Sequence, residues 1–309
     1  MAPTTAAYYV TGHGLGHATR SLLLIESLLS RGVKVHIISA IQPTFFETHV
    51  AGHIVGQLQC HQRTLDSGAI QQHALAVDAL TTLRKYRDNV HVHRETLIAE
   101  EAAFLRANAV DLVFVDATPV ACVASKRAGC CRCVCLVGAA SNPSFLYFPF
   151  RRCVLTTNFT WDFVYRSMLA YPYVQDALGP GEREQLEAMV ARCSEDYVAA
   201  DAYWQLPGKC PLPVGFAVEN VVGTAPLVAR QAKRPRQEVR EMYGVTDVAT
   251  KVLLVGFGGH DTQWQLKDTS LPDGWVAWVL GAKEADLPSG SARFVNMGEL
   301  DMLVVNMGE

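Results

Sequence analysis

The sequence predicts an α/β fold. We expect an N-terminal lobe built on a parallel sheet with helices on both faces, followed by the start of a second, incomplete lobe of the same kind. Short apolar runs of strand length alternate with longer segments of helical periodicity, an order typical of parallel sheets. A glycine-rich loop, residues 12–16, follows the first apolar run. A second apolar run that leads into glycines begins at Lys251 and predicts the second lobe.

Local patterns predict the first elements. We expect a strand at about residues 7–11, and a helix that follows the loop and runs to Arg31, because apolar residues recur there at helical spacing. Gly32 stands where a glycine commonly caps the C-terminus of a helix. The apolar run 34–39 predicts a second strand, and weaker strand signals lie at residues 53–64.

The alternation continues along the chain. Residues 75–108 carry a long helical pattern, with a break expected near Asn89. A buried strand is expected at 111–116, where it ends in a carboxylate. The helix predicted at 119–128 begins with a proline, which suits the first turn, and precedes a glycine, which suits a cap. Another strand is expected at 131–137.

The second half of the chain contains further helices before the pattern restarts. Helices are expected at about 159–169, 181–193 and 235–243, with a proline-rich connection before the last of them. The restart predicts a strand that begins at Lys251, and a further strand is expected at 275–280.

These elements predict three parts of the chain. They are an N-terminal lobe at 1–200, a connection at 201–250 and the truncated start of a C-terminal lobe at 251–309. The last part is shorter than a typical domain. We therefore expect the second lobe to be incomplete in this chain.

Composition narrows the class of function. With 309 residues, 50% of them hydrophobic, the chain can bury a large core. The net charge of −3 gives no electrostatic case for nucleic acid or an anionic membrane, so we expect a small-molecule partner. No secretory leader is apparent, and prolines interrupt the longest uncharged run, so no membrane span is expected. Nine cysteines without a secretory context favour a reduced, cytoplasmic protein. The cysteines at 130–135 lack the second pair that a closed zinc site needs, so we expect buried hydrophobic cysteines and no metal.

The glycine loop has the pattern Gly12-x-Gly14-x-Gly16, with His13 and His17 beside the glycines. Glycines let backbone approach a ligand closely, and the N-terminus of the following helix offers free N–H groups to an anion. A dinucleotide site would need Gly-x-Gly-x-x-Gly and an acid at the end of the second strand, and neither is present. The Gly-Lys-Ser/Thr loop of nucleotide triphosphatases is also missing.

His17 and Asp116 form the candidate catalytic pair. Both stand at or just beyond the ends of predicted strands, where parallel sheets bind ligands. A histidine beside an aspartate is an oriented base, because the carboxylate fixes the tautomer and stabilises the imidazolium. The alternative is that each residue only caps a helix. Arg20, early in the first helix, is a candidate phosphate ligand, with a solvated side chain as its alternative.

Longer motifs carry a resemblance to a known family. They stand, in order, at residues 8–20, 65–69, 111–121, 158–165, 206–211, 256–259 and 270–275. Together they span most of the chain, and they resemble the glycosyltransferase-like N-terminal region of plant and algal L-arabinokinases.

The resemblance implies a GT-B fold, in which two Rossmann-like lobes enclose a cleft. In inverting members, a histidine after the first strand deprotonates the acceptor hydroxyl, and an aspartate after a later strand orients it. His17 and Asp116 stand at the matching positions. The ligand-binding residues expected on this acceptor side are Gly12, His13, Gly14, Gly16 and Arg20.

By the same resemblance, the C-terminal lobe binds a sugar nucleotide, usually a uridine diphosphate (UDP) sugar. Gly256, Gly258 and Gly259 would begin that lobe, and His260 would either face the sugar nucleotide or cap the loop. No cofactor is implied, because the UDP-sugar would be the donor substrate. Expected partners are therefore a small-molecule sugar or sugar nucleotide, and a kinase domain in a full-length relative.

Two departures from the family's pattern shape the functional prediction. Residues 138–156 intervene as an atypical insertion, which we interpret as a retained intron read in frame. The chain also stops before the donor-binding segment and the sugar kinase region that phosphorylates L-arabinose with ATP. We therefore predict a sugar- or sugar-nucleotide-binding region of an L-arabinokinase-like protein. The alternatives are an active inverting UDP-sugar transferase with His17 as base, and a non-catalytic scaffold.

Overall fold

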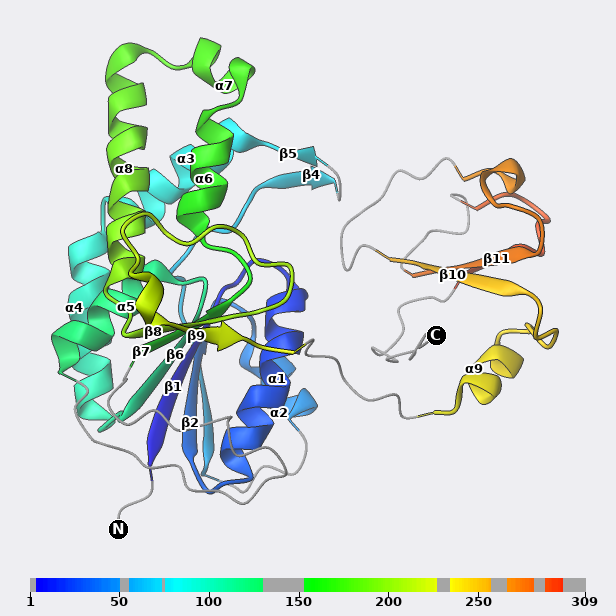
Figure 1. The fold of residues 1–309 in the computed structure, drawn as a ribbon, viewed down its shortest axis with the longest axis horizontal. Coiled ribbons are helices and arrows are strands. Elements are labelled where there is room, and N and C mark those ends of the chain that lie inside the picture. Colours follow the sequence, from blue (N-terminus) through cyan, green and yellow to red (C-terminus); the bar gives the residue numbers. More distant parts are fainter. Residues whose placement is uncertain are drawn as a thin grey trace. The chain divides into compact units, whose positions relative to one another are not determined.

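The computed structural model describes residues 4–50, 56–73, 76–129, 153–226, 234–256, 266–280 and 287–296. The chain divides into two compact units (Figure 1). The first comprises Met1–Ile70 and Asp78–Val228, and the second comprises Gln71–Val77 and Ala229–Glu309. Among the described residues, no helix is both long and apolar enough to cross a lipid bilayer.

A seven-stranded parallel sheet forms the centre of the first unit. Its strands are β1 (Thr5–Val10), β2 (Lys34–Ser39), β3 (Leu58–Gln62), β6 (Leu112–Asp116), β7 (Cys153–Thr157), β8 (Ala202–Gln205) and β9 (Val221–Thr224). Their spatial order is β3-β2-β1-β6-β7-β8-β9, so the sheet grows in one direction from β1 and then in the other from β6. That reversal between β1 and β6 is the point at which open α/β sheets bind ligands.

Helices cover both faces of this sheet (Figure 1). They are α1 (Leu15–Leu29), α2 (Pro43–His49), α3 (Ala79–Tyr86), α4 (Arg94–Ala107), α5 (Pro119–Ala128), α6 (Trp161–Leu169), α7 (Pro172–Ala177) and α8 (Pro180–Val198), with a 3₁₀ turn at Val218–Asn220. On one face, Leu22 and Ile25 of α1 pack with Tyr8 of β1. On the other face, the helices from α3 to α8 share a larger core with Tyr9 of the same strand. Side chains alternate between the two sides of a strand, and helices cover β1 on both sides. Its side chains therefore enter a core on each face of the sheet.

The structure confirms several elements expected from the sequence. The helical pattern of 75–108 breaks at a π-helical turn, Arg87–His91, which includes the expected position Asn89. Gly129 ends α5 with a φ of 64°, the left-handed conformation that favours glycine at a helix end. The strand expected at 131–137 lies outside the described residues. Strand β7 contains residues 153–156, the end of the expected insertion, and the part of that insertion at 138–152 also lies outside the described residues.

The second unit contains a smaller parallel sheet, β10 (Lys251–Val255), β11 (Trp275–Val279) and β12 (Phe294–Asn296), in that order. Helix α9 (Arg236–Met242) precedes it, and Val239 of α9 shares a small core with Trp278 of β11. The helix and the first two strands confirm expected elements. A 3₁₀ turn at Asp268–Ser270 and a two-stranded antiparallel hairpin, β4 (Gln71–His73) with β5 (Ala76–Val77), were not expected.

Candidate functional site

The candidate site begins where β1 and β6 end side by side. The two strands are parallel neighbours, with Val10 opposite Asp116, so the loop after β1 and the carboxylate of β6 share one edge of the sheet. The backbone N–H of Thr11 donates to the carbonyl oxygen of Asp116 at 3.1 Å. After Asp116 the chain turns sharply through Ala117, which has a φ of 59°, and Tyr197 donates its hydroxyl to the Ala117 carbonyl at 3.0 Å.

The glycine loop is confined on one side and open on another. A Cβ placed on Gly12 would lie 2.7 Å from the Cβ of Ala40, so only glycine fits there without a shift. Gly14 has a φ of 76° and forms the N-cap of α1. A Cβ on Gly14 or Gly16 would meet no atom within 4 Å. No side chain caps the first turn of α1 and no acidic residue stands in it, so its N–H groups are available to an anion.

His17 and Asp116 form a hydrogen-bonded pair. Nδ1 of His17 lies 2.9 Å from Oδ2 of Asp116, and the carboxylate is fully buried. The His17 side chain is 10% exposed, and its Nε2 has no hydrogen-bond partner among the described residues. Burial alone would raise the pKa of Asp116, but the charges and hydrogen bonds of His17 and Arg20 outweigh it and lower the pKa below its ordinary value. The pair therefore has the geometry of an oriented base.

Arg20 points into this pair. Its Nη2 donates to Oδ1 of Asp116 at 2.5 Å and lies 2.8 Å from Nδ1 of His17. The same nitrogen lies 3.2 Å from Oγ1 of Thr157, and Nη1 donates to Oδ1 of Asn158 at 2.5 Å. These contacts contradict a solvated side chain, and a role for Arg20 as a phosphate ligand stays a prediction.

A second buried carboxylate, Asp66, lies beneath the loop. Thr118 donates its hydroxyl to Asp66 at 3.4 Å. Burial raises the pKa of Asp66 to about 6, although hydrogen bonds from Thr11 and Gly12 and the charge of His17 act in the opposite direction. The carboxylate therefore joins the loop after β1 to the segment after β3.

His13 is engaged with the same segment after β3. The backbone N–H of Ala69 donates to Nδ1 of His13 at 3.2 Å. Gly68 has a φ of 58°, and a Cβ on it would lie 3.0 Å from that nitrogen. His13 also meets Trp161 edge-on, with ring centroids 5.3 Å apart. These contacts give His13 a structural role in holding the loop.

Phe159 and Trp161 form an aromatic cluster beside His17. Phe159 packs edge-on against His17, with ring centroids 5.1 Å apart, and Trp161 packs edge-on against Phe159 at 5.1 Å. Trp161 is only 1% exposed, so it belongs to the core and offers no face to a sugar. Phe159 contacts the His17 ring through packing.

Comparisons with known proteins agree with this architecture. UGT2 of Phytolacca americana, whose structure holds UDP-2fluoro-glucose and pterostilbene, superposes with a TM-score of 0.50 at 12% identity, over 96% of this chain and 71% of that one. The fold is that of the GT-B glycosyltransferases. A structure of the glycosyltransferase of kitacinnamycin gives a TM-score of 0.49 at 17% identity, over 93% of this chain and 68% of that one.

The sequence comparison gives a second relation. The chain is 36% identical, over 91% of its length, to L-arabinokinase of Arabidopsis thaliana, and it spans only 24% of that protein. No protein-family model matches the sequence. The chain is therefore similar to one part of a longer protein and has a GT-B glycosyltransferase fold.

Within this GT-B fold, the structure brings the residues expected on the acceptor side to one sheet edge. They are Gly12, His13, Gly14, Gly16, His17, Arg20 and Asp116. The residues expected on the donor side, Gly258, Gly259 and His260, lie outside the described residues. Three residues of the site were not predicted from the sequence, Asp66, Asn158 and Phe159, although all three stand in the motifs that carry the family resemblance.

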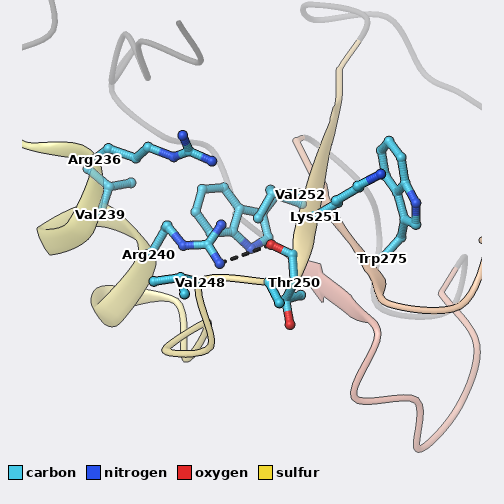
Figure 2. A pocket seen from close by; sticks show the side chains of 10 residues that line it. Arg236, Val239, Arg240, Val248, Thr250, Lys251, Val252 and Trp275 are labelled. Carbon is cyan, nitrogen blue, oxygen red and sulfur yellow. Dashed lines mark hydrogen bonds between the residues drawn. The ribbon is translucent and has the colours of Figure 1, made fainter. Parts of the chain in front are cut away.

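The second unit of the GT-B fold contains a cavity of about 350 Å³ between α9 and the amino ends of β10 and β11 (Figure 2). Arg240 lines it but donates to the carbonyl oxygens of Asp247 at 2.6 Å and Thr250 at 3.0 Å. The Lys251 ammonium lies over the Trp275 ring, 5.4 Å from its centroid. In sequence the expected donor residues come after β10, whereas the described residues that line this cavity lie on α9, just before β10, and on β10 and β11.

Proposed function

We propose that this chain is a sugar- or sugar-nucleotide-binding, glycosyltransferase-like region of an L-arabinokinase-like protein, with His17 as the base of its acceptor side. The observation that carries the proposal is the hydrogen bond between His17 and the buried carboxylate of Asp116 at the switch point of the sheet. The GT-B fold and the similarity to part of L-arabinokinase support it.

The pair is suited to activating a hydroxyl group. Nε2 of His17 would accept the proton of an acceptor hydroxyl, while Asp116 stabilises the imidazolium that forms. The freed oxygen would then attack the anomeric carbon of the donor sugar. As the new C–O bond forms, the bond from that carbon to the phosphate oxygen breaks, and the nucleoside diphosphate leaves with the electron pair. The donor class we propose is a UDP-sugar, because UGT2 was solved with UDP-2fluoro-glucose.

The first turn of α1 would contribute to anion binding. Its N–H groups have no side-chain cap and no acidic neighbour, and they begin directly at the glycine loop. Such a turn attracts a phosphate or another anion through the helix dipole and its free donors. Binding of a sugar nucleotide without transfer would make the chain a sensing module, and the absence of any binding would leave a scaffold role.

The experiment that tests the proposal is calorimetric titration of the chain with UDP, UDP-glucose, ATP and L-arabinose. We expect saturable binding of at least one of them, and weaker binding or lost turnover in His17→Ala. The matched control is His93→Ala, since His93 is an exposed histidine outside the site. Turnover is measured with a UDP-sugar labelled in the sugar. If none of the four ligands binds, the proposal is wrong and only the scaffold role is left.

A further inference from the structure

We propose that Arg20 is a positioning residue that holds His17 uncharged, by sharing the carboxylate of Asp116 with it. The proposal deepens the proposed function, because a base must be unprotonated to work. It assigns to Arg20 a role that differs from ligand binding. Three observations carry it: the contacts of Arg20 to both members of the pair, the burial around them, and the anchoring of the guanidinium by Asn158.

The contacts at Nδ1 of His17 place two groups in competition. Nδ1 lies 2.9 Å from a carboxylate oxygen of Asp116 and 2.8 Å from Nη2 of Arg20. A carboxylate can only accept and a guanidinium can only donate. With Nδ1 protonated, the neutral ring donates to Asp116 and leaves Nε2 unprotonated, as the proposed base requires; with Nδ1 unprotonated, the ring accepts from Arg20 and its proton lies on Nε2. The imidazolium carries a proton on both nitrogens and a full positive charge, so the guanidinium beside Nδ1 disfavours it relative to the neutral ring.

Charge balance points the same way. Asp116 is fully buried, so its negative charge is stabilised by few water dipoles. If His17 were its only cationic neighbour, the carboxylate would draw a proton onto the imidazole. The guanidinium of Arg20 lies 2.5 Å from the other carboxylate oxygen, Oδ1, and supplies the positive charge instead. The carboxylate is then neutralised without a charge on His17.

Other charged groups near His17 are accounted for. Asp66 is buried close enough to interact with the charge of His17, and it favours the imidazolium. Tyr8, on β1, faces Asp116 and Arg20, and burial together with Asp116 raises its pKa to about 12, so it stays neutral. Phe159 contributes packing only. The carboxylates of Asp116 and Asp66 both favour a charged His17. Among the described residues, Arg20 is the cation that contacts the His17 ring and opposes that charge.

The guanidinium is held in place by groups outside the pair. Nη1 donates to Oδ1 of Asn158 at 2.5 Å, and Nη2 lies 3.2 Å from Oγ1 of Thr157. Both residues stand at the end of β7, the strand beside β6. Arg20 comes from the first helix, so its position depends on two residues at the end of β7 that are 137 and 138 residues away in sequence. Because Asn158 and Thr157 hold the guanidinium, the fold fixes its distance from His17.

The test is an NMR titration of the 309-residue chain labelled with ¹⁵N-histidine, with the His17 signals assigned from a His17→Gln sample. In Arg20→Met we expect the titration midpoint of the His17 ring to move up by about one to three pH units, the range for a charge within contact distance. Arg20→Lys keeps the charge and should leave the midpoint close to that of the unmodified chain. Arg31→Met is the control, since Arg31 follows the far end of α1 and bonds to the Ser27 carbonyl at 2.6 Å.

Two results would overturn the inference: an unchanged or lower midpoint in Arg20→Met, or an equal rise in Arg20→Met and Arg20→Lys. If Arg20→Met does not fold, Arg20→Gln removes the charge while keeping a hydrogen-bonding side chain, and the same comparison applies. The titration needs no substrate. Its failure therefore leaves the proposed function standing, whereas the ligand titrations test that function separately.

Discussion

His36 connects the fold to pH through a measurable loss of stability. It lies in β2 with no exposed surface, and its Nδ1 is 3.0 Å from Nε2 of His61 on β3. The two rings stack with centroids 5.2 Å apart, and Phe104 meets His36 edge-on at 5.7 Å. Burial, reinforced by repulsion from His61 and Lys34, lowers the pKa of His36 from 6.5 to about 4.

The sign and size of the effect follow from proton linkage. The unfolded chain binds a proton at His36 near pH 6.5, but the folded chain does so only near pH 4. The stabilisation is therefore fully present above pH 6.5 and is lost as the pH falls from 6.5 toward 4. At about 1.4 kcal/mol per pH unit, this difference amounts to about 3 kcal/mol of unfolding free energy. Burial also lowers the pKa of His61, which adds a loss of the same sign.

The assay is urea unfolding of the unmodified chain and of His36→Gln at about pH 7.5 and pH 4.5. We expect the unmodified chain to lose more stability than the variant over this interval, by most of the 3 kcal/mol expected for His36. His93→Gln, which removes an exposed histidine, is the control and should follow the unmodified chain. Comparing changes with pH cancels any pH-independent effect of the substitution. Equal losses in the unmodified chain and His36→Gln would refute the reasoning.

Three further predictions concern the site and the core. Asp116→Asn keeps the shape of the side chain but removes its charge, and any transfer activity should fall by at least about 10²-fold with the fold intact, as measured by labelled-sugar turnover and circular dichroism. Unchanged turnover would contradict a catalytic role for the pair. Gly12→Ala should destabilise the chain by about 1–3 kcal/mol in urea unfolding, because its Cβ would lie 2.7 Å from the Cβ of Ala40. Adding Ala40→Gly should restore the loss, and no rescue would show that the contact is not the cause. Asp196→Ala should cost about 3 kcal/mol of unfolding free energy, at the low end for a broken buried pair, because the guanidinium of Arg94 loses the carboxylate that it contacts at 2.9 Å and, among the described residues, keeps only that of the exposed Glu95. Glu195→Ala changes an exposed neighbouring residue and is the control. An equally small loss of unfolding free energy in Asp196→Ala and Glu195→Ala would mean that the buried Arg94–Asp196 pair contributes little to stability.

Much of the fold could be predicted because local patterns decide it. The break near Asn89 appears as a π-helical turn, and Gly129 ends its helix in the left-handed conformation. The hairpin β4–β5 was missed because its strands are only three and two residues long and have no clear alternation. Strand β7, Cys153–Thr157, was missed because residues 153–156 belong to the segment interpreted as an insertion, and only pairing with β6 and β8 identifies them as part of a central strand.

The sequence by itself determined the alternation of strands and helices in the first part of the chain, the glycine loop at the end of the first strand, and the residue types able to do acid–base chemistry. These features depend on residues that are close together in sequence, so residue propensities and hydrophobic periodicity can predict them. Only the tertiary structure decided which of those residues meet. His17 and Asp116 are 99 residues apart, and their contact depends on β1 and β6 lying side by side at the switch point of the sheet. The inward position of Arg20 depends further on β7 lying beside β6, which brings Asn158 to the guanidinium. Pairing between distant strands is set by the packing of the whole sheet, so the partners of Arg20 could not be read from the residues around it.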